Sequence, residues 1–181
     1  MGNDMFYKAE VNNYQLAIVK CLLIIILGSS LLSCSTEDKS PGDSEIKINL
    51  VADQDINPND SGHPAPLNIF IYNVKEPDVF INADFFEIVE GNSKPLQAAI
   101  SKVYEAILQP GELRNVTIKL DGNSRMLGFI GAYRDLNDAI WLATWTLPEK
   151  RLSWWENLLS NNSLTLQAHF QKTAITIKKV D

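Results

Sequence analysis

The sequence predicts a mainly β protein, an all-β sandwich of two sheets with about eight short strands and one or two short added helices. Apolar residues recur at every second position through most of the chain after residue 44, which is the period of a strand with one buried face. Turn residues separate these segments at short intervals, as they do in a sandwich. Helical spacing of apolar residues occurs in only two stretches.

The first two predicted strands lie on either side of a loop rich in proline and asparagine. Ile46, Ile48 and Leu50 share one face of the first strand. The second strand, from Ile69 to Val74, is apolar on both faces. A strand with two apolar faces is usually covered on both sides, so we expect it in the centre of a sheet.

The next two segments are predicted to pair as a hairpin. Tyr104, Ala106 and Leu108 form one face of a strand that ends at the turn signal Pro110-Gly111. Val116, Ile118 and Leu120 follow, and Asp121-Gly122-Asn123 closes this strand.

Three regions complete the predicted sheets. Met126 to Tyr133 has two apolar faces and two glycines that allow a neighbour to approach closely, so we expect a core strand. Trp141, Ala143, Trp145 and Leu147 share a face of the next strand. Leu164 to Phe170 and Ala174 to Lys178 alternate in the same way and predict a terminal hairpin.

Two stretches follow the helical period instead. Val79, Ala83 and Phe86 fall at i, i+4 and i+7 after Pro77, which predicts one or two short helices packed on the sandwich. Leu152, Trp155 and Leu159 have similar spacing around the Trp154-Trp155 pair. Aromatic residues at this spacing usually belong to a core, but a partner-facing role stays open for both stretches, the Phe85-Phe86 group and the tryptophan pair.

The N-terminal region has the features of a lipoprotein signal. An apolar run from Leu22 to Leu32 follows Lys20 and is well short of the roughly 20 residues that span a bilayer. It ends in Leu31-Leu32-Ser33-Cys34, which resembles the lipobox of bacterial lipoproteins. We predict a signal peptide over residues 1–33, a lipidated Cys34 with a flexible tether over 34–44, and one periplasmic β-sandwich domain over 45–181. An ordinary secretory signal or an uncleaved anchor is the alternative.

Composition and charge exclude several classes of function. Removal of residues 1–33 from the 181-residue chain leaves 148 residues, enough for one domain with its own core. The removed part carries two lysines and two acidic residues, so the formal net charge stays at −6. Such a chain does not bind nucleic acid through bulk charge. The only cysteines are Cys21 and Cys34, so no thiol remains for a disulfide or a nucleophile.

Candidates for catalysis are few, and we predict no enzyme, no cofactor and no metal centre. His63 lies in the proline-rich loop and His169 in a predicted strand, and the chain has no G-x-S-x-G motif. Two histidines without free cysteines make a poor zinc site. The aspartate pairs Asp53 with Asp55 and Asp135 with Asp138 indicate solvated surface, although a weak calcium site stays open there.

Several blocks in order resemble the outer-membrane lipoprotein family of the bacterial type VI secretion system, TssJ or SciN. Residues 57–66, NPNDSGHPAP, precede Ile69-Phe70-Ile71-Tyr72 as in the family's "LNPdxxGrPsPvxvriYqL" segment. Further blocks are Phe80 with Ala83-Asp84-Phe85-Phe86, the turn Pro110-Gly111-Glu112, and residues 127–136 (LGFIGAYRDL) with Trp141 after them. The departures are Ile56, His63 and Ala65, where the family usually has Leu, Arg and Ser, and the Trp154-Trp155 segment.

This resemblance implies a transthyretin-like sandwich held at the periplasmic face of the outer membrane by its lipid. It also implies binding to the periplasmic C-terminal domain of the inner-membrane protein TssM. The implied contact is the loop between the first two strands, residues 53–66. Its candidate residues are Asn57, Pro58, Asn59, Asp60, His63 and Pro64.

Two alternatives to this interpretation stay open. The loop could be an ordinary solvated turn. The chain could also be a periplasmic carbohydrate- or lipid-binding lipoprotein that stacks its ligand on Trp141, Trp145, Trp154 or Trp155, although the first two lie on a strand face that is more typical of a core.

Overall fold

The structure is a computed structural model that describes residues 44–147 and 164–180, which fall within one compact unit, Ser40–Asp181. Eight strands and three short helices occur in this described part. The strands are β1 (Ser44–Ala52), β2 (Leu67–Val74), β3 (Ile100–Leu108), β4 (Leu113–Leu120), β5 (Met126–Gly131), β6 (Leu142–Thr146), β7 (Thr165–Phe170) and β8 (Ile175–Val180). The helices are α2 (Pro77–Ile81), α3 (Phe85–Glu90) and α4 (Lys94–Ala99).

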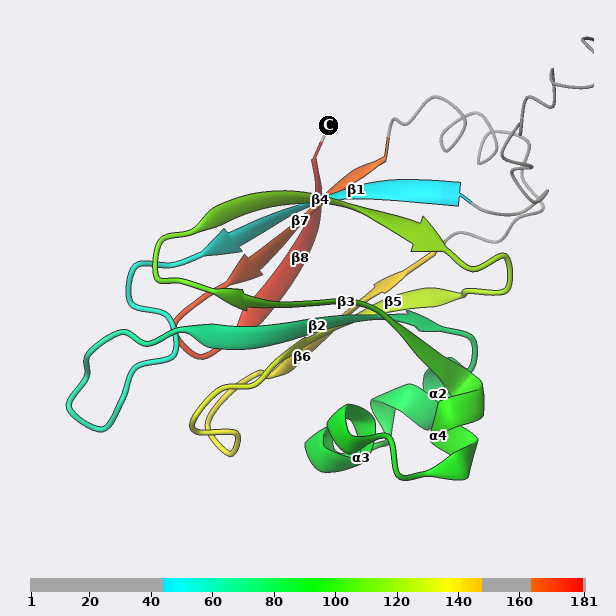
Figure 1. The fold of residues 1–181 in the computed structure, drawn as a ribbon, viewed down its shortest axis with the longest axis horizontal. Coiled ribbons are helices and arrows are strands. Elements are labelled where there is room, and N and C mark those ends of the chain that lie inside the picture. The colour runs from blue at the N-terminus through cyan, green and yellow to red at the C-terminus, as the bar shows by residue number, and fades with distance from the viewer. Residues whose placement is uncertain (1–43, 148–163, 181) are drawn as a thin grey trace, which may run out of the picture. The chain divides into compact units, whose positions relative to one another are not determined.

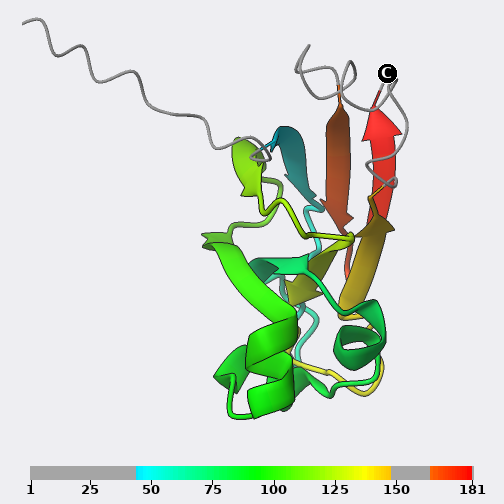
Figure 2. The ribbon, with the colours of Figure 1, turned by 90° about the vertical axis from the view of Figure 1, so that its right-hand side faces the viewer.

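The strands form two four-stranded sheets that lie one above the other (Figures 1 and 2). Sheet A has the order β4-β1-β7-β8, and sheet B has the order β3-β2-β5-β6. Neighbouring strands are antiparallel except β1 and β7, which run parallel with Lys47 opposite Thr165. The predicted two-sheet sandwich of about eight strands is therefore confirmed, and so is the terminal hairpin of β7 and β8.

The main core fills the space between the two sheets. Ile46, Ile48 and Leu50 of β1 are fully buried there, as their alternation predicts. They pack with the inward-facing residues of the other strands. These include Ile69 and Ile71 of β2, Phe129 of β5, and Leu166 and Phe170 of β7.

Strands β2 and β5 are covered on both faces, which confirms the expectation that they are central. Their outward residues form a second core with the helices, made of Phe70, Tyr72, Val74, Phe80, Ile88, Leu96, Met126 and Ile130. Gly128 of β5 is essential to this packing. A Cβ atom at Gly128 would lie 2.3 Å from two ring carbons of Phe80, so the glycine makes room for a helix residue on the strand.

The helical layer contains three helices where one or two were expected. Phe80, Ile88 and Leu96 are its fully buried large side chains, whereas Phe86 is 60% exposed. The predicted series of Val79, Ala83 and Phe86 fails because it does not lie on one helix. Asp84 starts a new helix through a capping box with Glu87. Helix α4 was not predicted, and its signals are Ser93 and Pro95 at its start.

The predicted hairpin of β3 and β4 is wrong. β3 pairs with β2 in sheet B, whereas β4 pairs with β1 in sheet A. Residues 109–112 between them form a corner that passes from one sheet to the other. Gly111 has φ of +75° there and is covered by the side chain of Gln54, so a residue with a side chain would be both strained and crowded.

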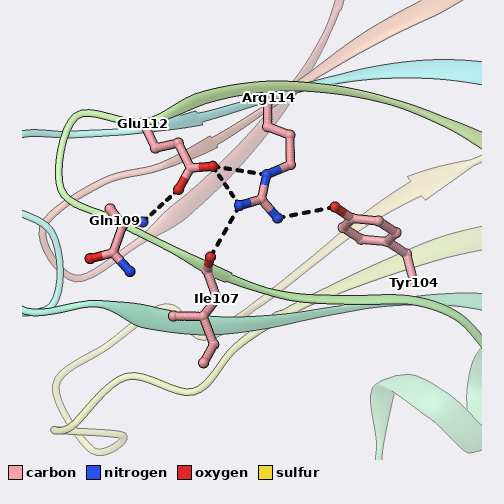
Figure 3. A network of polar contacts seen from close by, with 5 residues as sticks. All are labelled: Tyr104, Ile107, Gln109, Glu112 and Arg114. Atoms are coloured by element: carbon pink, nitrogen blue, oxygen red, sulfur yellow. Dashed lines mark hydrogen bonds and ion pairs between the residues drawn. The ribbon is translucent and has the colours of Figure 1, made fainter.

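A polar network holds this corner together (Figure 3). Arg114 on β4 donates to the Glu112 carboxylate through Nε, at 2.8 Å, and through Nη2. It also donates to the carbonyl of Ile107 and the hydroxyl of Tyr104 on β3, each at 3.3 Å. The hydrogen bond from the Gln109 N–H lowers the pKa of Glu112 most; burial opposes it, and the hydrogen bond and charge of Arg114 lower the pKa further.

The tryptophans of the described part pack against apolar side chains. Trp145 is half-buried on β6 against the main core. Trp141, just before β6, lies edge-on to Phe85 of α3 with ring centroids 5.5 Å apart. The predicted helical stretch around Trp154-Trp155 lies outside the described residues. Within the described ranges, no helix has the length and apolar character needed to cross a bilayer.

Candidate partner-binding loop

The loop between β1 and β2, residues 53–66, connects the two sheets at one end of the sandwich (teal, at the left of Figure 1). It begins where β1 ends, so the length of a nine-residue strand separates it from Ser44. At 3.2–3.4 Å per residue this distance is about 30 Å. The loop therefore lies at the end of β1 opposite to the point where the chain enters the sandwich.

The base of the loop is fixed by Ile56 and Asn57, which are both buried. Asn57 has φ of +47°, a left-handed conformation that asparagine tolerates better than most residues. Its side-chain Nδ2 donates to the carbonyl of Pro66 at 2.8 Å, and its Oδ1 accepts the N–H of Arg134 at 2.8 Å. Its own N–H donates to the carbonyl of Lys172 at 3.0 Å. Asn57 thus ties the loop to two other connections, β5–β6 and β7–β8.

The tip of the loop is shaped by Asn59. Its Oδ1 accepts the N–H groups of Ser61 and His63, both at 3.0 Å. Its backbone N–H donates to the carbonyl of His63 at 2.8 Å, and its carbonyl accepts the N–H of Gly62 at 2.8 Å. Asp60 and the residues from Ser61 to Pro64 are exposed. The tip is a closed turn that presents these side chains to solvent.

A histidine and a carboxylate meet beneath the loop. His169 Nε2 on β7 lies 2.6 Å from Oδ1 of Asp53, the first residue of the loop. The backbone of Asp53 accepts the N–H of Gly111 at 3.0 Å and donates to the carbonyl of Phe170 at 2.9 Å. This pair joins the loop to β7 and to the β3–β4 corner. The alternating pattern of β7 placed His169 in a strand, but no sequence signal paired it with Asp53.

Tyr133, which follows β5, hydrogen-bonds to the β7–β8 connection, which the backbone of Asn57 also contacts. Its hydroxyl lies 2.8 Å from the carbonyl of Ala174 and 3.0 Å from that of Gln171, both in the β7–β8 connection. Burial, and to a smaller extent the charge of Asp53, raises the pKa of Tyr133 well above its usual value. The hydroxyl therefore stays protonated and available as a donor at neutral pH.

The six candidate residues divide into two groups. The side chain of Asn59 bonds within the loop, that of Asn57 bonds to Pro66 in the loop and to Arg134 outside it, and Pro58 is half-buried. Asp60, His63 and Pro64 are exposed at the tip. The histidines His63 and His169 lie in different places, at the tip and on β7. Cys34 is outside the described residues.

The described part offers no arrangement for metal chemistry. Within residues 44–147 and 164–180, no three His, Cys, Asp or Glu side chains gather so that they could hold a metal ion. Asp135 instead accepts the backbone N–H groups of Asn137 and Asp138 at 3.2 and 3.4 Å and forms an ordinary turn. The arrangement of the loop is suited to protein recognition, because it exposes side chains on a backbone that is already ordered.

One family model and several solved structures match this chain. A family model described as type VI secretion lipoprotein, VasD, EvfM, TssJ matches residues 44–173. A comparison with curated proteins gave no match. The crystal structure of the T6SS lipoprotein TssJ1 from Pseudomonas aeruginosa is 29% identical over 76% of this chain and 97% of its own, with a TM-score of 0.65.

Two further solved structures share the fold at lower identity. Serratia marcescens Lip, a membrane-bound component of the type VI secretion system, is 20% identical over 76% of this chain and 98% of its own, with a TM-score of 0.65. A structure of the T6SS protein TssM C-terminal domain from EAEC is 18% identical over 76% and 99%, with a TM-score of 0.56.

Proposed function

We infer the function of this chain from the premise that it belongs to the type VI secretion lipoprotein family, whose model matches residues 44–173. The family resemblance predicted from the sequence is thereby confirmed, and so is the sandwich fold. The family is one of secretion-system lipoproteins and not a known class of enzyme.

We propose that the chain is an assembly component of the secretion system's membrane complex, anchored in the outer membrane by lipid on Cys34. The support for the anchor is the lipobox before a polar tether. Several acyl chains on one cysteine would hold the domain stably, because two hydrophobic signals already suffice for stable membrane attachment. Ten tether residues would let the domain reach roughly 35 Å from the bilayer.

We propose further that the tip of the β1–β2 loop binds the periplasmic C-terminal domain of TssM. The observation that carries this proposal is the ordered tip itself: Asn57 and Asn59 fix the backbone while Asp60, His63 and Pro64 stay exposed. A surface that is ordered before binding loses little entropy on binding. A structure of the TssM C-terminal domain is also among the fold matches, which supports a link between the two proteins.

Titration calorimetry of residues 35–181 with the periplasmic domain of TssM tests this proposal. Asp60→Lys should weaken binding at least tenfold, or about 1.4 kcal/mol, because it reverses a charge at the tip. Glu76→Lys is the matched control, since Glu76 is also exposed and makes no side-chain cap for α2. The proposal fails if both variants bind as the wild type does, or if the wild-type domain does not bind at all.

A further inference from the structure

The outer face of sheet A, which points away from the core, carries three lysines. Lys47 on β1 alternates with the buried Ile46 and Ile48. Lys119 on β4 stands between the buried Ile118 and Leu120. Lys178 on β8 likewise follows Ile177, which packs against the core. All three side chains are exposed, and we call Lys47, Lys119 and Lys178 the basic face.

The pairing of the strands brings Lys47 and Lys119 to the half of the sheet where β1 begins, and Lys178 to a level near the middle of β1, level with Asn49. Lys47 lies opposite Thr117 of β4 and Thr165 of β7, and Lys119 lies opposite Glu45. Lys47 and Lys119 are therefore diagonal neighbours, about 7–8 Å apart. Lys178 is opposite Gln167 of β7. Among the described residues, none of the three ammonium groups forms an ion pair. Glu45 is the only acidic residue on the four strands of sheet A.

The helical layer on the opposite side of the sandwich is acidic overall, although α4 begins with Lys94. Between Glu76 and Glu90 the chain has five acidic residues and no lysine or arginine. This stretch forms α2 and α3, which cover the outer face of sheet B, whereas sheet A forms the other outer layer (Figures 1 and 2). The domain is thus electrically polarised across its layers, although the formal net charge of the chain is −6.

We propose that the basic face rests on anionic phospholipid headgroups of the membrane that holds the chain. This inference rests on the proposed lipid anchor. The tether of residues 34–44 would join the domain at Ser44, at the end of sheet A where Lys119 and Lys47 lie, and so keep the basic face close to the bilayer. Each lysine near an anionic surface favours association by about fivefold. The same surface repels the acidic helical layer, so the two effects select one orientation.

The consequence is an oriented domain. With the basic face on the headgroups, β1 lies along the membrane surface and the helical layer points into the periplasm. The long aliphatic stems of the lysines allow their ammonium groups to reach headgroups from a flat sheet. The β1–β2 loop then projects from the side of the domain, where a partner can reach it without crossing the bilayer.

The test anchors the domain without relying on acylation. Residues 35–181 carry a hexahistidine tag in place of Cys34 and are held on vesicles by a nickel-chelating lipid. No native cysteine remains in this segment, so a single fluorophore can be attached at Thr117→Cys on sheet A or at Ala98→Cys on α4. Both positions are exposed. A headgroup-linked quencher is added to vesicles of phosphatidylcholine, with or without one third phosphatidylglycerol.

In the anionic vesicles the label at position 117 should be quenched at least twice as strongly as the label at 98. The difference should vanish in neutral vesicles and in high salt, which screens the attraction. It should also vanish when Lys47, Lys119 and Lys178 are all replaced by Gln. The matched control replaces Lys94, Lys102 and Lys172 by Gln, which changes the net charge equally and should preserve the difference.

Equal quenching of both labels in anionic vesicles would overturn the proposal. An acidic protein would then be the expected partner of the basic face. A triple basic-face variant that behaves like the control would overturn it as well. Because the tag replaces the acyl chains, neither result depends on whether Cys34 is lipidated. Failure of this inference is thus distinguishable from failure of the proposed anchor.

Discussion

At the scale of single residues, Asn57 determines the conformation at the base of the β1–β2 loop. Its side-chain amide satisfies one donor and one acceptor of the backbone, at Arg134 and Pro66. Its own backbone takes a left-handed conformation. Buried backbone groups that lose their partners destabilise a fold by roughly 1–3 kcal/mol each, so this one side chain affects both stability and loop geometry.

Asn57→Ala should lower the free energy of unfolding by about 2–4 kcal/mol, since it orphans two backbone groups and strains the left-handed backbone. Urea denaturation checks this. Asn57→Gly relieves only the strain and should fall between the wild type and the alanine variant. A loss below half a kcal/mol for Asn57→Ala would contradict the role assigned to the amide.

Phe129 fills the centre of the main core on β5 and is fully buried. Phe129→Ala should destabilise the domain by about 3–5 kcal/mol, because a large cavity replaces the ring. Thermal melting should show a large downward shift and little soluble protein. Ile107→Ala is a suitable comparison, since Ile107 is 57% exposed and its loss should shift the melting temperature only slightly.

Tyr72 makes the stability of the domain sensitive to alkaline pH. Burial raises its pKa to about 12, with a smaller contribution from the charge of Glu105. In the unfolded chain tyrosine ionises near pH 10, so the folded state favours the neutral phenol. This stabilisation is complete below about pH 10 and is lost as the pH rises towards 12.

Tyr72→Phe should therefore reduce the loss of stability between about pH 10 and 12, as measured by urea denaturation at several pH values. The ring can stay in place, since the hydroxyl makes only a long hydrogen bond of 3.5 Å to the carbonyl of Ile88. Identical pH dependence of variant and wild type would show that Tyr72 does not titrate in this range.

The sequence predicted the type of environment at several residues but not their partners. Two glycines in β5 predicted that a neighbour approaches closely, and an aromatic ring does pack against Gly128. The sequence did not predict that this ring belongs to Phe80, because that depends on where the helices pack. His169 was placed correctly in a strand, whereas its contact with Asp53 joins positions 116 residues apart. Pairings at such separations follow from sheet topology, which a local pattern does not encode.

At the scale of elements, the apolar patterns, alternating or continuous, located every strand of the described part but did not assign each to a sheet. β3 and β4 follow each other through a Pro-Gly turn, which is also how a hairpin is made. Unlike a hairpin turn, residues 109–112 pass from one sheet to the other. Arg114 on β4 hydrogen-bonds to Glu112 and to the carbonyl of Ile107 on β3 and so fixes this corner. The predicted helical series also differs from the structure. The capping box at Asp84 starts a new helix and so divides an apolar series that looked continuous in the sequence.

Replacement of residues 58–63 by a short Gly/Ser linker should leave the sandwich folded and weaken binding to the TssM periplasmic domain at least tenfold. Asn57 must be kept, because it belongs to the buried base of the loop. Surface loops tolerate length changes at a small entropic cost. Circular dichroism should match that of the wild type, and calorimetry should show the loss. Unchanged affinity would move the proposed interface away from the tip.

At the scale of the whole molecule, Cys34→Ala should release the chain from the membrane and leave its fold intact, because Cys34 precedes in sequence the first residue of β1, Ser44. Fractionation of cells that make the variant measures how much of it stays in the membrane fraction. The uncleaved precursor must be scored separately on the same gel. Tight membrane association of the processed variant would rule out lipid on Cys34 as the anchor.

Strand β1 has a mechanical consequence in this arrangement. The tether enters at its first residue, and the proposed partner-binding loop leaves from its last. Tension between the outer membrane and an inner-membrane partner would therefore act along the axis of this strand. β1 is paired with β4 through eight residues and with β7 through six, and these hydrogen bonds lie across the direction of pull. They would bear the load together in shear and would not open one after another, so the sandwich would resist unravelling from its N-terminal strand under such tension.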